Sequence, residues 1–142
     1  MNQMSPVQIQ QARSVFFGVI GAPYTRDWTM PFFRLLTEVL DRGTDTVVWT
    51  CGNATTMTSK LMWREGDPIH PHSHSHSCSC PLPDVASELL RSYPDNLRWY
   101  ICKYCMEERG AINQIDGVEI KLPFSFDTYT HMADQSLVFG TK

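Results

Sequence analysis

The order of apolar and polar residues along the chain predicts strands and helices in alternation. Short continuous apolar runs are typical of strands that are buried on both faces of a sheet. The predicted strands cover residues 14–20, 46–51, 97–101 and 136–139. Helical spacing of apolar residues predicts helices over about residues 29–42, 54–63, 84–93, 105–109 and 124–133. This alternation predicts an α/β fold, a layered sandwich around a mostly parallel central sheet.

Two of the predicted helices carry an apolar face. The first repeats apolar residues at helical spacing, namely Phe32, Phe33, Leu35, Leu36, Val39 and Leu40. In the last, Phe126, Tyr129 and Met132 are spaced for burial. Gly43 is expected to end the first helix, and Asp84 is a candidate cap for the helix over residues 84–93.

The chain is expected to form one domain with a tail and an insertion. Its 142 residues are enough to bury one core. Residues 1–13 are largely polar and are expected to be an N-terminal tail, so the predicted domain covers residues 14–142. Residues 69–83 are low in complexity and have almost no apolar content, and we interpret them as an exposed loop or insertion.

Composition narrows the class of protein. The hydrophobic content of 42% is ordinary for a globular protein, and a net charge of −3 with a pI near 5.9 gives no reason to expect nucleic-acid binding. No run approaches the roughly 20 apolar residues of a membrane helix. Residues 1–13 also lack the apolar stretch of a secretory signal. We therefore expect a cytoplasmic protein without a nucleic-acid or membrane partner.

Five cysteines, an odd number, argue against a structural disulfide framework and favour redox, sulfur or metal chemistry. Cys102 and Cys105 lie where a predicted strand meets a predicted helix. A helix start favours a thiolate, and Lys103 and Arg109 add positive charge there. Cys102 is the leading candidate for the chemistry, with Cys105 and Arg109 beside it. The pair could instead be half a zinc site or two small buried residues.

The predicted topology places this pair at one edge of the sheet. In open α/β sheets, reactive residues collect at the carboxyl ends of the strands. Residues 21–27, Cys51-Gly52 and the segment from Cys102 to Cys105 all follow predicted strands. One pocket could therefore collect all three features.

A second candidate site lies in the segment interpreted as an insertion. Its possible metal ligands stand at every second position, namely His70, His72, His74, His76, Cys78 and Cys80. In an extended conformation all six would project from one face. Imidazole and thiolate together suit zinc, copper or nickel. The alternative is a hydrophilic loop that binds metal only adventitiously.

Several motifs in the second half of the chain resemble those of the DsrE/DsrF-like superfamily, and most closely its YchN-like members. The matching motifs are Cys102-Lys-Tyr-Cys105, Arg109-Gly110, residues 115–119 and residues 133–139. The resemblance covers roughly residues 14–64 and 84–139. The His/Cys-rich segment, residues 70–80, departs from it. The resemblance implies a compact α/β sandwich that assembles as a homotrimer or homohexamer.

The resemblance also implies a role in sulfur relay. In this superfamily the cysteine that accepts sulfane sulfur as a persulfide lies eight residues before the glycine of an Arg-Gly pair, which is the position of Cys102. Cys105 matches a second cysteine of YchN-like members. Such a protein would take sulfur from a donor protein and pass it to an acceptor protein, and thiol exchange requires no cofactor. It could act as a sulfurtransferase or as a carrier.

The sequence therefore supports two hypotheses. In the first, the chain relays sulfur and Cys102 receives it first. In the second, it is a metal-binding or metal-responsive oligomer that uses the His/Cys-rich segment.

Overall fold

The computed structural model describes residues 11–23, 27–62 and 81–140. The strands of these ranges are β1 (Ser14–Ile20), β2 (Asp45–Cys51), β3 (Leu97–Cys102), β4 (Val118–Lys121) and β5 (Gln135–Phe139). The α-helices are α1 (Thr29–Asp41), α2 (Leu82–Ser92), α3 (Lys103–Glu108) and α4 (Ser125–Met132). Two 3₁₀ segments, η1 (Gly52–Thr58) and η2 (Lys60–Met62), follow β2. Elements therefore alternate as the sequence predicted.

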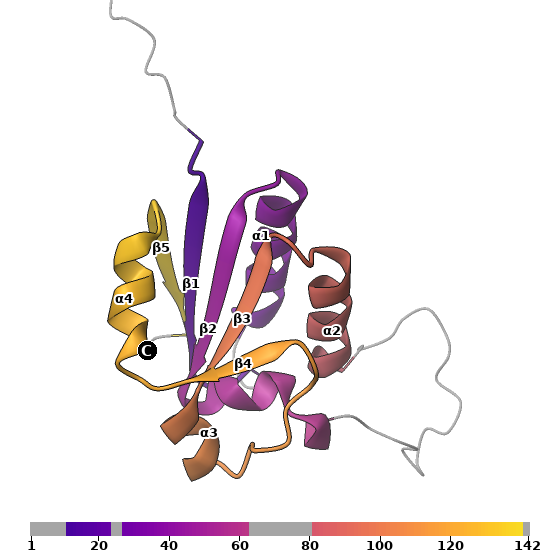
Figure 1. The fold of residues 1–142 in the computed structure, drawn as a ribbon. Coiled ribbons are helices and arrows are strands. Elements are labelled where there is room, and N and C mark those ends of the chain that lie inside the picture. Colours follow the sequence, from indigo (N-terminus) through magenta and orange to yellow (C-terminus); the bar gives the residue numbers. More distant parts are fainter. Residues whose placement is uncertain (1–10, 24–26, 63–80, 141–142) are drawn as a thin grey trace, which may run out of the picture.

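The strands form one parallel sheet in the order β4-β3-β2-β1-β5. This confirms the predicted α/β layered fold. The register pairs Ile20 with Cys51 and Cys102 with Lys121. Because all strands point the same way, their carboxyl ends share one edge of the sheet, where α3 also lies (Figure 1).

The direction of the chain across the sheet explains where the helices lie. From β1 to β4 the chain advances strand by strand in one direction, and the last connection returns across the sheet to β5. Parallel crossovers are right-handed, so a reversal of direction moves the connecting helix to the opposite face. Helices α1 and α2 accordingly cover one face, and α4 covers the other (Figure 1).

Each face of the sheet has its own apolar cluster. The larger lies under α1 and α2 and includes Phe17, Phe32, Leu36 and Trp99. The smaller, on the α4 face, contains Phe16, Trp49, Tyr100 and Cys102, with Phe126 and Tyr129 of α4 packed against them. Aromatic rings fill this second cluster, and some meet edge to face, as Trp49 and Phe126 do at 5.7 Å between centroids. One sulfur of the predicted site is therefore part of a packed core.

Three local predictions differ from the structure. The segment after β2 forms short 3₁₀ turns instead of an α-helix, and its threonines bond locally, as Thr55 does to the Gly52 carbonyl. Helix α2 begins at Leu82, before the expected cap Asp84. Met132 is 71% exposed. At 3.6 residues per turn, Met132 lies well off the direction of Phe126, whereas Ala133 returns to it and packs.

Across the described ranges, no helix combines the length and the apolar character needed to cross a membrane.

Candidate functional site: a cluster of three thiols

Three cysteines from separate segments meet at the carboxyl edge of the sheet. Cys51 is the last residue of β2, and Cys102 is the last residue of β3. Cys105 lies in the first turn of α3, which Cys102 precedes as the N-cap residue. Strand neighbours in a parallel sheet end together, so adjacent β2 and β3 bring Cys51 and Cys102 to the same place. Helix α3 then returns Cys105 toward both.

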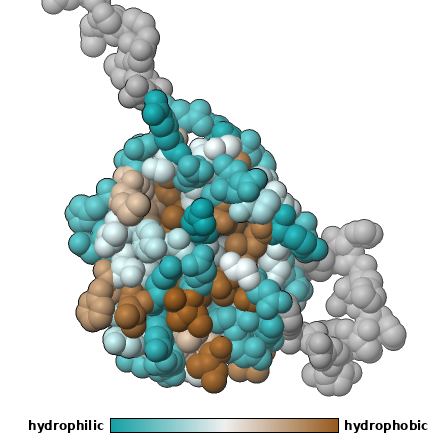
Figure 2. Space-filling model, in the orientation of Figure 1, coloured by the Kyte–Doolittle hydropathy of each residue, from teal (hydrophilic) through white to brown (hydrophobic). Residues whose placement is uncertain are grey.

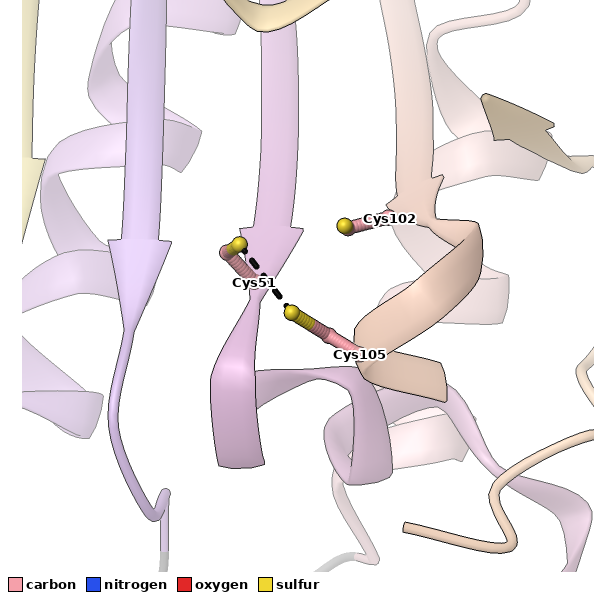
Figure 3. A group of neighbouring side chains, drawn as sticks. All are labelled: Cys51, Cys102 and Cys105. Atoms are coloured by element: carbon pink, nitrogen blue, oxygen red, sulfur yellow. Dashed lines mark hydrogen bonds between the residues drawn. The ribbon is translucent and has the colours of Figure 1, made fainter. Parts of the chain in front are cut away.

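The three side chains point toward one another. Their sulfur atoms all lie within 4.8 Å of each other, and Figure 3 shows them converging from β2, β3 and α3. Cys51 Sγ and Cys105 Sγ are 3.4 Å apart, which is hydrogen-bond distance for thiols. All three are free thiols. We call this group of Cys51, Cys102 and Cys105 the thiol cluster.

Burial differs among the members of the thiol cluster. Cys102 is only 1% exposed and packs with the aromatic residues of the α4 face. Cys51 and Cys105 are partly buried. A molecule that approaches from solvent therefore meets Cys51 or Cys105 before Cys102.

The local environment also separates the pKa values of the three thiols. Burial, with smaller contributions from the neighbouring thiols, raises the pKa of Cys51 to about 12. Burial also raises the pKa of Cys102, and a hydrogen bond from the Cys105 backbone only partly offsets this. At Cys105 burial is outweighed, because hydrogen bonds from the Gly52 backbone and from both other thiols, with the charge of Arg109, lower its pKa. The sequence predicted Cys102 as the more activated thiol, whereas its surroundings raise the pKa of Cys102 and lower that of Cys105.

Arg109 joins the two segments that carry the cluster. Its Nε donates a hydrogen bond to Asn53 Oδ1 at 2.6 Å, which connects α3 to η1. Its Nη1 donates to the Cys105 carbonyl at 3.3 Å and forms an ion pair with Glu108 at 3.2 Å. Arg109 therefore provides positive charge beside Cys105, as expected, and also fixes the position of α3.

Sequence reasoning gave no role to some residues of this site. Cys51 and Gly52 were named as a feature of the edge, but their closeness to Cys105 depends on the position of α3. Gly52 adopts a left-handed φ of 57°, and its N–H contributes to the lowered pKa of Cys105. Lys121 is the register partner of Cys102, with Nζ 4.9 Å from the centre of the Tyr100 ring. The apolar pattern of the strands does not predict the contact between Gly52 and Cys105 or the one between Lys121 and Tyr100.

Two other sequence features fall partly or wholly outside the described residues. The loop over residues 21–27 is described only in part. The predicted metal ligands His70, His72, His74, His76, Cys78 and Cys80 all lie outside the described residues.

Comparison with known proteins shows similarity at the level of the fold. No protein-family model matches the chain, and no curated protein matches it. Among solved structures, the crystal structure of YchN from E. coli superposes with a TM-score of 0.68 at 21% sequence identity, covering 89% of this chain and 99% of that one. The chain has a YchN-like fold. This confirms the fold that the resemblance implied, and the thiol cluster lies within that fold.

Proposed function

We propose that this protein carries sulfane sulfur on its thiol cluster and passes it from a donor protein to an acceptor protein. The observation that supports this most is the convergence of three free thiols within 4.8 Å at the carboxyl edge of a YchN-like sheet. Sulfur transfer between thiols needs a second sulfur atom within reach of the first. The cluster provides this, and the exchange requires no cofactor.

Exposure assigns the first step to Cys105. Its thiolate attacks the outer sulfur of a donor persulfide, a new sulfur–sulfur bond forms, and the donor leaves as a thiolate. Cys102 is buried and lies too deep for direct contact with a donor protein. The sequence alone placed the first step at Cys102, and the difference in burial reverses this order.

Cys102 then holds the sulfur. Its sulfur attacks the outer sulfur of the Cys105 persulfide, the bond to Cys105 breaks, and the thiol proton of Cys102 passes to the released Cys105 sulfur. A persulfide on Cys102 lies among Trp49, Tyr100 and Tyr129, where small thiols from solvent have little access. Reversal of the same exchange returns the sulfur to Cys105 for delivery to an acceptor.

The test loads the reduced protein with glutathione persulfide and locates the added sulfur by peptide mass spectrometry. The expected result is sulfur on Cys102 at equilibrium. Cys105→Ser should load slowly. Cys102→Ser should load at a normal initial rate on Cys105 and then lose the sulfur rapidly to added glutathione. Glu107→Gln, on the exposed side of α3, is the matched control and should behave as the parent protein.

Peptide mapping also separates the thiol cluster from Cys78 and Cys80. Sulfur found only on those two cysteines, or undiminished loading after both Cys102 and Cys105 are replaced, would contradict the proposal. Full-rate loading of Cys102 in the Cys105→Ser variant would reverse the assigned order of the two thiols.

A further inference from the structure

The thiol cluster also has the composition of a site for a soft metal ion. We propose that Cys51, Cys102 and Cys105 bind one monovalent copper ion in trigonal sulfur coordination. This inference does not rest on sulfur transfer, because it concerns the three sulfur atoms as ligands and includes Cys51, which the proposed transfer does not use.

The spacing of the sulfur atoms fits one shared metal ion. Three ligands about 2.3 Å from a metal in a trigonal plane lie about 4 Å from one another. The three sulfurs already lie within 4.8 Å of each other, and the closest pair, Cys51 and Cys105, is 3.4 Å apart. Side chains from β2, β3 and α3 therefore need only a small rearrangement to surround an ion (Figure 3).

The donor set selects the metal. Thiolates are soft ligands that favour Cu⁺, zinc and iron–sulfur clusters, and zinc in an all-sulfur site takes four ligands in a tetrahedron. In the part of the chain that the structure describes, the group with metal-ligand spacing consists of these three cysteines and contains no histidine or carboxylate. A three-sulfur site satisfies Cu⁺, whereas zinc would lack its fourth protein ligand.

The surroundings suit a small ion with a negatively charged ligand set. Three thiolates and one Cu⁺ carry a net charge of −2, and the positive charge of Arg109 lies beside Cys105. Arg109 Nη1 also donates a hydrogen bond to the Cys105 carbonyl. The buried side of the cluster is Cys102 with its aromatic neighbours, which limits access of water and oxidants to the ion.

The test must separate this site from the His/Cys-rich segment. The background protein is the full-length chain in which the six ligands of that segment are replaced, with the histidines changed to Gln and the cysteines to Ser. Reduced, metal-free background protein is titrated with Cu⁺ under anaerobic conditions against a chromogenic Cu⁺ chelator. One tightly held Cu⁺ per chain is expected, and X-ray absorption should report three sulfur neighbours. This measurement keeps all three cysteines and does not depend on their substitution.

Variants then assign the ligands. Each cysteine is replaced in the background protein, as Cys51→Ala, Cys102→Ala or Cys105→Ala. Each variant should weaken Cu⁺ binding more than about 100-fold, because removal of a ligand lowers metal affinity at least as much as loss of a group that hydrogen-bonds a ligand. Glu107→Gln in the same background should bind as the background does. Circular dichroism of each variant checks that the fold is retained.

The outcomes separate the two proposals. Failure of the background protein to compete with the chelator, two sulfur neighbours instead of three, or tight binding by a folded Cys51→Ala variant would overturn the copper site. Preference for zinc with a fourth oxygen or nitrogen neighbour would also overturn it. Sulfur loading is measured separately on metal-free protein, so its failure leaves the copper result standing. If both proposals hold, Cu⁺-loaded protein should no longer accept sulfur.

Discussion

The three cysteines are chemically identical residues that the fold makes different. Cys102 faces the aromatic cluster beneath α4, and Cys51 ends the neighbouring strand. Cys105 lies on the short helix α3, which follows the end of β3. Burial is the largest influence on each thiol, and it raises the pKa wherever compensating contacts are few. Only Cys105 collects enough hydrogen bonds and positive charge to reverse that effect.

This difference predicts the order of alkylation in reduced, metal-free protein. Within the thiol cluster, iodoacetamide should label Cys105 first and Cys102 last, because Cys105 is more exposed and ionises more readily while Cys102 is 1% exposed. Peptide mass spectrometry after timed quenching measures the order. Urea-unfolded protein is the control, since the three rates should converge there. Earlier labelling of Cys102 in folded protein would contradict the burial that the structure shows.

Arg109 should affect both stability and the reactivity of Cys105. Arg109→Gln removes the hydrogen bond to Asn53 at 2.6 Å and the positive charge beside Cys105. The free energy of unfolding should fall by about 1 kcal/mol, and alkylation of Cys105 should slow at a fixed neutral pH. Urea unfolding and timed alkylation measure the two effects.

The matched control for this prediction is Arg91→Gln. Arg91 forms an exposed ion pair with Glu88 on α2 at 2.6 Å, and such surface pairs stabilise by at most about 1 kcal/mol and often by nothing measurable. It should leave alkylation of Cys105 unchanged. Equal effects of the two substitutions on the rate of Cys105 alkylation would show that the charge of Arg109 does not specifically activate Cys105.

At the scale of elements, β1 and β5 end against each other in a way that requires glycine. A Cβ on Gly140 would lie 1.7 Å from the Ile20 carbonyl oxygen, and one on Gly21 would lie 2.7 Å from the Gly140 carbonyl oxygen. Both glycines have positive φ angles, of 81° and 94°. This close approach is at the same edge of the sheet as the thiol cluster.

Gly140→Ala should therefore cost far more stability than another glycine with similar backbone geometry. Gly43 has a φ of 73° and nothing within 4 Å of its position for a Cβ, so Gly43→Ala should cost about 1–2 kcal/mol from backbone strain alone. Gly140→Ala adds a clash with backbone and should cost at least about 2 kcal/mol more. Urea unfolding compares the two. Similar losses of unfolding free energy in the two variants would show that the ends of β1 and β5 can move apart without loss of stability.

Over the surface of the molecule, the segment from β4 to α4 exposes large apolar side chains. These are Ile120, Leu122, Phe124 and Met132, of which Phe124 is 76% exposed and Met132 is 71% exposed. Figure 2 shows hydrophobic residues gathered in the lower half of the view, among hydrophilic ones. Exposed apolar patches of this kind are typical of interaction sites, and aromatic residues and methionine are enriched at interfaces.

We predict that this exposed segment mediates assembly into a homotrimer or homohexamer. Sedimentation velocity at micromolar concentration should show one of these states. Phe124→Asp should shift the protein toward monomer while its far-UV circular dichroism stays unchanged, because a charge would be buried at the interface. Leu61→Asp is the control, since Leu61 of η2 is similarly exposed at 71% but lies outside this set. A monomeric parent protein would exclude the prediction.

Local patterns of apolar and polar residues locate most of the helices and strands. Continuous apolar runs were sufficient to locate β1, β2 and β3, because strands buried on both faces of a parallel sheet need no polar alternation. A short apolar run also located β5, although this strand is an exposed edge of the sheet. Helical spacing located α1 and α4, although it wrongly predicted burial of Met132. It also placed Cys102 and Cys105 between a strand and a helix. These features depend on residues close together in the chain, so local patterns contain the information.

Contacts between residues far apart in the chain follow from how the elements pack together. The return of the chain from β4 to β5 puts α4 over Trp49 and Tyr100, and this buries Cys102. The packing of α3 against η1 brings Cys105 to Cys51 and Arg109 to Asn53. Burial and hydrogen bonding set the properties of each thiol, and both depend on neighbours contributed by other elements. The sequence therefore indicated where sulfur chemistry could occur, whereas the packing of the elements decided which thiol is accessible and that a third belongs to the cluster.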